Sequence, residues 1–340
     1  MTSTTPSELQ TSRTTREKYF LGVDVGSSKT LALIADESWR CLGYGRAWGG
    51  NHQDVGYDGL AHVLLESFQG ACQMAGLAPG QIAGAGFGVA GYDFPTDHPP
   101  HLGAIAGLGL SCPLELVNDG VNGLIAGSSH GVGVNLTAGS GVNCRGRGPD
   151  GREGRIVGNG VSFGEFGGGI EIAWKGLHMV NYAWIKRIPP TALTQVYLQA
   201  TGARDELDLM EGLSTDRYHL FPYITVEIFR VARQGDDAAR EVLHWAGQEL
   251  GWLAVAVIRQ IGMESQPVEV VLSGSVFEGG ELICAPLRAV ILQHIPRAQI
   301  VRLECPPVVG PLLLGMQAAG LAGYPVRGAL SESAKELVKE

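Results

Sequence analysis

The chain has 340 residues, 45% of them hydrophobic and only 17% charged, a balance that excludes a disordered chain and allows two domains with sizeable cores. Its formal net charge of −9 makes it a poor general binder of nucleic acid or anionic membranes, so neither is expected as a partner. Six cysteines without a CxxC pair are typical of reduced thiols and argue against a zinc site. The sequence has no apolar signal segment and no run of membrane-helix length, so we expect a cytoplasmic protein.

The first half of the chain predicts three strands followed by alternating helices and strands. Residues 1–18 are rich in Ser and Thr and are expected to form a mobile tail. The segments that follow are FLGVDV, GSSK, TLALIAD, ES and WRCLGYGRA, which read as strand, Gly-Ser loop, strand, tight turn and strand. A helix near 57–77, a strand within 82–93, a second helical stretch and a short strand at 114–118 come next.

The second half repeats this order with different letters. The segments GVGVNLT, AGSG, VNCRGRG, PDG and REGRIVGNG again read as strand, Gly-Ser loop, strand, turn and strand. Both halves are therefore βββαβαβα, which predicts a duplicated α/β domain with parts at 19–128 and 129–309. A helical insertion is expected at about 168–235 in the second part, followed by a clear helix at 237–262.

The last 30 residues predict a short apolar helix and a polar end. GPLLLGMQAAGL, beginning at residue 310, has the composition of a buried helix, and its small residues allow close helix contact. The final GALSESAKELVKE is polar and is expected to form a frayed helix.

A set of motifs, in this order along the chain, resembles the motifs of a known group of proteins. The motifs are DVGSSKT, GNH, GVAGYD, LVNDG, AGSGVNCRG, GEFGGG and LSGSVF. Over about residues 19–322 they are similar to the actin/hexokinase/heat-shock-protein ATPase superfamily, and within it to the BadF/BadG/BcrA/BcrD-type family that contains N-acetylglucosamine kinase. The resemblance implies two ribonuclease H-like (actin-like ATPase) domains, a final helix at about 310–325 that returns to the first domain, and a homodimer.

The two Gly-Ser loops are the expected phosphate site for ATP. In the family they face each other across a cleft, and their backbone N–H groups cradle the phosphates. Asp24 would hold Mg²⁺ through water, because that ion keeps much of its hydration shell. The alternative for one loop alone is a plain hairpin with a polar tip. The predicted phosphate-binding residues are Gly26, Ser27, Ser28, Lys29, Thr30, Gly139, Ser140 and Gly141.

Asp119 ends the strand LELVN and is the expected general base, which accepts the proton of the acceptor hydroxyl. The alternative is that Asp119 caps the next helix, although Asn118 could serve as the cap instead. The resemblance also assigns adenosine binding to Gly274, Ser275 and Gly279, for which a simple strand-to-helix turn is the alternative.

The resemblance places a sugar on Asn51, Asn143 and Glu165, together with Asp119 and Ser140. For the two asparagines the alternative is ordinary turn chemistry. Glu165 departs from the family's shorter Asp, and Phe166 replaces a second acid. We expect the longer side chain to push its carboxylate further into the pocket and to favour an acceptor such as glucosamine. The sequence HPPH at 98–101 is expected to be a surface Pro turn.

Together these features predict an ATP- and Mg²⁺-dependent kinase that phosphorylates a primary hydroxyl of an amino sugar or related hexose. The alternative is an ATPase that drives conformational change in a redox enzyme, as relatives in the family do with an iron–sulfur cluster at their dimer interface. A non-catalytic sugar or nucleotide sensor is disfavoured because both Asp24 and Asp119 are present.

Overall fold

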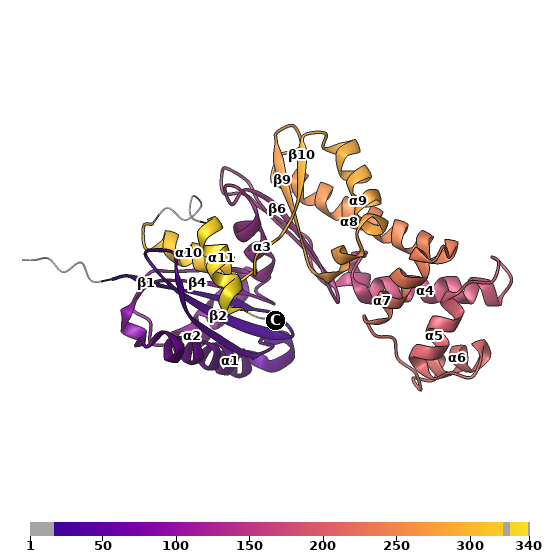
Figure 1. Cartoon of the computed structure of the whole chain (residues 1–340), viewed down its shortest axis with the longest axis horizontal. Coiled ribbons are helices and arrows are strands. Elements are labelled where there is room, and N and C mark those ends of the chain that lie inside the picture. Colours follow the sequence, from indigo (N-terminus) through magenta and orange to yellow (C-terminus); the bar gives the residue numbers. More distant parts are fainter. Residues whose placement is uncertain (1–16, 322–326, 339–340) are drawn as a thin grey trace, which may run out of the picture.

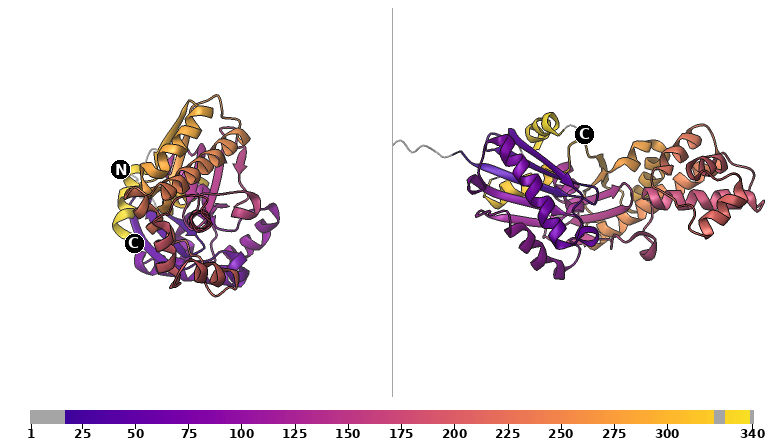
Figure 2. Two further views of the ribbon diagram at one scale, coloured as in Figure 1. Left: turned by 90° about the vertical axis from the view of Figure 1, so that its right-hand side faces the viewer. Right: turned by 90° about the horizontal axis from the view of Figure 1, so that it is seen from below.

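The computed structural model describes residues 17–321 and 327–338 as two mixed five-stranded sheets with helices packed around them (Figure 1). Of the expected N-terminal tail, residues 1–16 lie outside the described residues, as does part of the stretch expected to hold the final helix. The two halves lie end to end along the longest axis, and the helical insertion forms the far end of the second half (Figure 2). The predicted α/β fold class is confirmed.

The first sheet has the order β3-β2-β1-β4-β5, in which β1 pairs antiparallel with β2 and parallel with β4. Its central strands are buried on both faces, which accounts for their nearly continuous apolar sequence. The strands are β1 (Tyr19–Val25), β2 (Lys29–Asp36), β3 (Cys41–Trp48), β4 (Ile82–Val89) and β5 (Leu114–Asn118).

The second sheet has the order β10-β9-β6-β7-β8. Read from its last-named strand it becomes β8-β7-β6-β9-β10, which is the order of the first sheet strand for strand, with the same antiparallel and parallel pairs. The duplication inferred from chemistry and order is therefore present in the strand topology. The strands are β6 (Gly133–Ala138), β7 (Val142–Arg147), β8 (Glu153–Arg155), β9 (Val268–Ser273) and β10 (Ala298–Arg302).

Polar side chains cap the first turns of the two longest helices, α1 and α8. Asn51 caps α1 and Asp236 caps α8, each by accepting a backbone N–H of the first turn. α1 begins earlier than predicted because a break at Gly56, with φ 69°, interrupts its regular pattern. The long helices are α1 (His52–Ala75), α2 (His98–Ala106), α3 (Asp119–Gly127), α4 (Gly169–Trp184), α5 (Leu193–Thr201), α6 (Glu206–Ser214), α7 (Ile224–Arg233), α8 (Asp237–Gln260), α9 (Glu281–His294), α10 (Val309–Ala318) and α11 (Arg327–Leu337).

Helix α10 packs against β1 and β4 of the first sheet, although it follows the last strand of the second (Figure 1). Glycines make this approach possible. A Cβ on Gly86 would lie 2.9 Å from the backbone nitrogen of Gly315, and a Cβ on Gly22 would lie 2.6 Å from Cα of Leu312. The helix is therefore seated directly on strand backbone, where a larger residue could not fit.

The C-terminal helix α11 is not frayed, so that expectation is wrong over its described residues. Leu330 and Ala334 are fully buried in the same cluster as α10 and β2. Ser333 Oγ accepts the backbone N–H of Cys41 at 2.9 Å, at the edge of the first sheet. The sequence of α11 is mostly polar, and only two or three apolar residues form the buried face of this amphipathic helix. The sequence pattern therefore did not reveal that the helix is packed. No helix within the described residues has the length and apolar character needed to cross a membrane.

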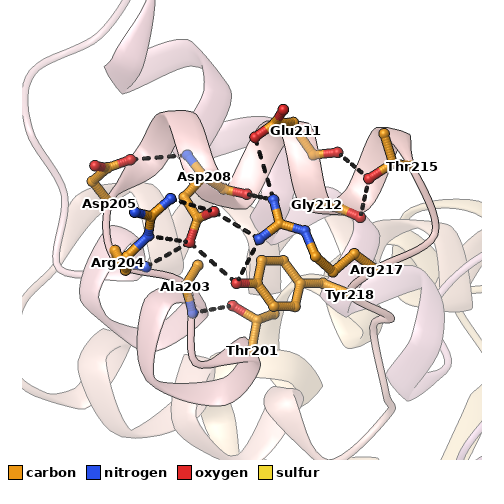
Figure 3. Close-up of polar contacts among 10 residues, drawn as sticks. All are labelled: Thr201, Ala203, Arg204, Asp205, Asp208, Glu211, Gly212, Thr215, Arg217 and Tyr218. Carbon is orange, nitrogen blue, oxygen red and sulfur yellow. Dashed lines mark hydrogen bonds and ion pairs between the residues drawn. The ribbon is translucent and has the colours of Figure 1, made fainter.

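The insertion is held at its tip by the buried carboxylate of Asp208 on α6 (Figure 3). Two arginines and a tyrosine reach this carboxylate: Arg204 Nη2 at 3.2 Å, Arg217 Nη1 at 2.8 Å and Tyr218 Oη at 3.1 Å. The hydrogen bonds from Arg204 are the largest cause that holds the pKa of Asp208 well below its ordinary value. The carboxylate thus joins α6 to the residues on both sides of that helix, beside the apolar cluster that contains Leu209.

Replacement of Asp208 by Asn should destabilise the insertion, because it removes the buried charge that accepts hydrogen bonds from the exposed guanidinium groups of Arg204 and Arg217. Since the folded-state pKa is depressed, the stabilisation is present above about pH 4 and is lost as the pH falls further. We expect a lower melting temperature for Asp208→Asn at pH 7, and a difference from wild type that shrinks in acid. Asp237→Asn is the matched control, because that side chain is 98% exposed. Equal melting temperatures for the two variants would contradict the role of Asp208.

Candidate functional site

The first phosphate loop is the tip of the β1–β2 hairpin. Gly26 donates its N–H to the Lys29 carbonyl oxygen at 2.9 Å, which closes the loop. The segment before α1 supports it from behind: Gly50 N donates to the Gly26 carbonyl oxygen at 3.0 Å, and a side chain on Gly49 would clash with the Ser27 backbone. Thr30 Oγ1 is buried and has no hydrogen-bond partner. The loop is therefore a fixed, glycine-backed turn with an unused hydroxyl.

The second phosphate loop, between β6 and β7, is fixed by the N-terminus of α4. Gly169 N donates to the Gly139 carbonyl oxygen at 2.8 Å, and Ile170 N donates to the Ser140 carbonyl oxygen at 3.0 Å. A Cβ on Gly168 would lie 2.6 Å from Cα of Gly141, so the GEFGGG segment needs glycine here. A Cβ on Gly139 or Gly141 would meet nothing within 4 Å, which leaves the other side of the loop open to a ligand.

A cavity of about 430 Å³ adjoins this second loop and joins it to the predicted adenosine motif. Gly139, Ser140, Ser275 and Gly279 line it together. Gly274 does not line it but has φ 101° and sits against the Ala138 backbone, a conformation that favours glycine. Sequence reasoning missed the wall contributed by the insertion, whose residues carry no motif. That wall consists of Pro222, Tyr223, Thr225, Val226, Phe229 and Arg233.

Two carboxylates stand at the strand ends that face the cleft, Asp24 on β1 and Asp119 just after β5. Burial, the largest cause, and the charge of Asp24 together raise the pKa of Asp119 to about 7, while Arg145 opposes the rise. Burial likewise raises the pKa of Asp24 to about 6, although Asn122 Nδ2 donates to its Oδ1 at 2.6 Å. The two groups therefore interact as like charges in a shared, poorly solvated place.

Three asparagines lie around Asp119. Asn118 is the cap of α3, since its Oδ1 accepts Gly120 N at 2.8 Å, and this leaves the Asp119 carboxylate out of the capping role. Asn143 Nδ2 donates to the same Asn118 oxygen at 3.2 Å. The Oδ1 atoms of Asn122 and Asn143 are buried and have no partner, as expected for groups that bind a ligand.

Asn51 has the local structural role weighed from the sequence and also reaches the first loop. Its Oδ1 accepts Gln53 N at 3.0 Å as the cap of α1, and its Nδ2 lies 3.5 Å from Ser27 Oγ in the first phosphate loop. The following His52 has a buried Nδ1 without a partner. The structure thus places Asn51 beside the phosphate loop, and its contact with a sugar stays a prediction.

Glu165 is oriented differently from what the longer side chain led us to expect. Its carboxylate is buried and accepts three backbone N–H groups, from Val157 at 2.6 Å, Gly158 at 2.8 Å and Asn159 at 3.0 Å. It therefore anchors the loop that precedes α4. The argument that its extra methylene pushes the carboxylate into the pocket loses its basis, and with it the expected preference for glucosamine.

The HPPH segment is not a surface turn, so that interpretation is wrong. It is the first turn of α2, with proline at the positions where a helix tolerates it. His101 is fully buried, donates its Nδ1–H to the Asp97 carbonyl oxygen, and contacts the rings of His52, Tyr57 and Tyr92. The described residues hold no group of three or more His, Cys, Asp or Glu side chains suited to a metal.

Residues 21–315 match the BadF/BadG/BcrA/BcrD ATPase family. The chain belongs to this family. Membership of the BadF/BadG/BcrA/BcrD ATPase family implies the use of ATP, which agrees with two glycine-rich loops and a cavity that joins one of them to the predicted adenosine motif.

Two curated relatives are similar over nearly their whole length. The N-acetyl-D-glucosamine kinase of Dictyostelium discoideum is 25% identical over 318 residues, which cover 89% of this chain and 99% of the relative. The N-acetylmuramic acid/N-acetylglucosamine kinase of Clostridium acetobutylicum is 23% identical, with 87% and 98% covered. The similarity therefore extends through both halves of this family member.

Solved structures share the fold. A Chromobacterium violaceum protein, provisionally named an N-acetylglucosamine kinase, has a TM-score of 0.65 at 22% identity and covers 87% of this chain and 98% of its own. A glucokinase of the ROK family from Streptomyces griseus, solved with glucose and AMPPNP, has a TM-score of 0.51 at 18% identity, with 94% and 99% covered. Both support the two-domain actin-like ATPase fold.

Asp119→Asn should raise stability, because it removes a carboxylate whose folded-state pKa lies above its unfolded value. A raised pKa means that the folded protein loses stability relative to the unfolded chain as the pH rises from about 4 to about 7. The gain for the variant should therefore grow over this interval and level off above it, reaching on the order of 3 kcal/mol. Chemical denaturation at pH 5 and pH 8 measures it, and an equal or smaller gain at pH 8 would contradict the assignment.

Proposed function

We propose that the protein is an ATP-dependent kinase that transfers the γ-phosphoryl group to a hydroxyl of an amino sugar or related hexose. The observation that carries this proposal is the environment of Asp119. Its carboxylate has a pKa near 7, is left out of the helix cap, and lies beside asparagine amides. A base poised near the working pH suits abstraction of a hydroxyl proton.

The two loops supply the nucleotide site. The cavity at Ser140, Ser275 and Gly279 has room for a nucleoside, since ligand cavities of this kind start near 300 Å³. Backbone N–H groups in glycine-rich loops and the hydroxyls of Ser27, Ser28 and Thr30 suit the phosphate oxygens, and Thr30 Oγ1 has no other partner.

Mg²⁺ fits the oxygen ligands beside Asp24. The carboxylate of Asp24 and the unpartnered Oδ1 of Asn122 are the hard donors that this ion prefers. When bound, the ion would neutralise charge on the transferring phosphoryl group. Asp24 is the residue that would hold it, through water or directly, and Asn122 keeps the Asp24 carboxylate oriented.

The acceptor side supports a polyhydroxylated substrate. Amide groups both donate and accept, as sugar hydroxyls do, and a buried hydroxyl left unpaired costs about 1–3 kcal/mol. Asn51 and Asn143 supply such amides, and the relatives from Dictyostelium and Clostridium are named as kinases of N-acetylglucosamine. We therefore propose an N-acetylated or free hexosamine as acceptor, with its primary hydroxyl at Asp119.

An ATPase that drives a redox partner is the second candidate within the family. Iron–sulfur clusters are held by cysteine thiolates. The six cysteines lie on different elements and loops and all are buried or half-buried, so none is displayed on the exposed surface for a cluster shared between two copies. This placement favours the kinase. A homodimer is part of the proposal, and sedimentation analysis tests it.

A panel of acceptors tests the proposed function. With ATP and Mg²⁺, N-acetylglucosamine, glucosamine and glucose should each be compared for ADP release and for phosphorylated product by mass spectrometry. At least one amino sugar should raise ADP release well above the rate without acceptor. ATP hydrolysis that no sugar stimulates would move the partner-driving ATPase ahead.

The rate should depend on the ionisation of Asp119. Because the base must be deprotonated, kcat/KM for the acceptor should fall about tenfold per pH unit below the pKa of Asp119 and level off above it. The midpoint should lie between the ordinary value of Asp and about 7, since a cation at Asp24 lowers the pKa. Asp119→Asn should lose about a hundred- to ten-thousandfold in turnover while ATP affinity is kept. Full turnover in this variant would exclude Asp119 as the base.

Glu165→Gln should loosen the loop at residues 157–159. A neutral amide oxygen replaces one charged acceptor and its NH₂ group faces backbone donors, a loss of about 2 kcal/mol that corresponds to roughly 30-fold. We expect the loss in KM or kcat for the acceptor, with ATP affinity unchanged, as measured by steady-state kinetics and calorimetry. A parallel loss of ATP affinity would contradict a role confined to this loop.

A further inference from the structure

A ring of four polar side chains crosses the cleft beside Asp119 and includes none of the phosphate-loop residues. On the first domain, Asn118 Nδ2 donates to Asp93 Oδ1 at 3.1 Å. On the second, Asn143 Nδ2 donates to Asn118 Oδ1 at 3.2 Å, and Arg145 Nη2 donates to the same Asp93 oxygen. Asn143 and Arg145 are two residues apart on β7, so both project from one face of that strand and close the ring.

We propose that Arg145 is a positioning residue of the reaction: by pairing with Asp93 it docks β7 onto the loop after β4, and thereby fixes the Asn118–Asn143 pair next to the Asp119 carboxylate. The kinetic part of this inference rests on the proposed kinase function. Arg145 itself is not placed on the substrate.

Packing around Gly120 ties the ring to the base. A Cβ on Gly120 would lie 2.6 Å from Arg145 Cγ, 2.9 Å from Asn143 Nδ2 and 3.0 Å from Asn118 Oδ1. The backbone immediately after Asp119 is thus clamped between the arginine stem and two amides. A shift of Arg145 moves the peptide that carries the base.

Because Arg145 is buried, its ion pair with Asp93 is important for holding this part of the cleft together. Arg145 is 6% exposed and its Nε has no hydrogen-bond partner, so the carboxylate of Asp93 is the ion-pair partner of a nearly enclosed cation. Burial lowers the pKa of Arg145, and the charge of Asp93 is the largest influence against that change. Removal of either member leaves the other as an uncompensated buried charge, which is far more disruptive than loss of an exposed pair.

Arginine suits this place better than lysine. Its planar guanidinium can hold Asp93 through one nitrogen while its stem lies flat on Gly120. A lysine keeps the charge but presents a single flexible point donor. Arg145→Lys should therefore recover only part of what Arg145→Gln loses.

The kinetic test separates positioning from nucleotide binding. Arg145→Gln should lower kcat/KM for the acceptor by about a hundredfold, in proportion to a lost buried charge pair, while ATP affinity by calorimetry stays within about twofold. Arg40→Gln is the matched control, because it removes an Arg–Asp ion pair at the β2–β3 turn, and it should leave both values unchanged. An acceptor kcat/KM near wild type in folded Arg145→Gln would overturn the proposal, as would an equal loss of ATP affinity.

A double-mutant cycle tests the pairing with Asp93. If the two side chains act together, Asp93→Asn combined with Arg145→Gln should lose about as much as Arg145→Gln alone. If the losses in acceptor kcat/KM of the two single variants multiply in the double variant, the two side chains act independently, and the proposed ring is wrong.

Hydrogen exchange keeps this inference separate from the proposed function. Backbone amides of residues 90–94 and 143–146 should exchange faster in Arg145→Gln than in wild type and Arg40→Gln, without any acceptor present. Faster exchange supports the ring even if wild type phosphorylates no sugar, in which case the kinase proposal alone fails. Unchanged exchange at both segments overturns the ring even if wild type is an active kinase.

Discussion

The burial of two like charges, Asp24 and Asp119, is the constraint on which the rest of the site depends. Each carboxylate lies at the end of a strand of the first sheet; burial is the largest cause that raises the pKa of both, and the charge of Asp24 also raises the pKa of Asp119. Such a pair costs stability and persists only where the surrounding fold is rigid enough to hold it. The rigidity comes from α10, which is seated on the strand backbone at Gly22 and Gly86, and from α3, which connects the two sheets at the cleft. The stabilising contacts thus lie around the two carboxylates, which are themselves destabilising.

Glycine serves this architecture in two distinct ways. In the first sheet it lets a helix approach strand backbone, so the sheet is held firmly below the cleft. At Gly49, Gly168 and Gly120 it lets three chain segments cross directly behind the two loops and the base. The phosphate loops themselves are open on their other side at Gly139 and Gly141. The 50 glycines of the chain thus include a set of close backbone contacts, some with open space on one side.

Features repeated along the chain could be predicted, and features made by single contacts could not. The duplicated strand order, the loop positions and the helix at 237–262 follow from alternation, turn residues and capping, which are local. The three amide contacts of Glu165 depend on a loop conformation that no spacing encodes. The burial of His101 and of α11 depends on which surface each finds, and their local sequence is polar or proline-rich. The insertion's share of the cavity beside the second loop was missed for the same reason.

The groups around Asp119 hold its backbone in place without pairing a cation with its carboxylate. Asn118 and Asn143, whose amides are hydrogen-bonded to each other, flank the backbone that follows Asp119, and neutral amides lower the pKa of a carboxylate much less than a cation in contact would. Among the described residues Arg145 is the one buried arginine or lysine; it is paired with Asp93, and its charge only partly opposes the rise in the pKa of Asp119. A direct Arg–Asp119 pair would hold the base ionised but make it a weak proton acceptor. With Asp93 as intermediary, the arginine gives the site its rigidity, and Asp119 keeps a pKa at which it can both lose and accept a proton near neutral pH.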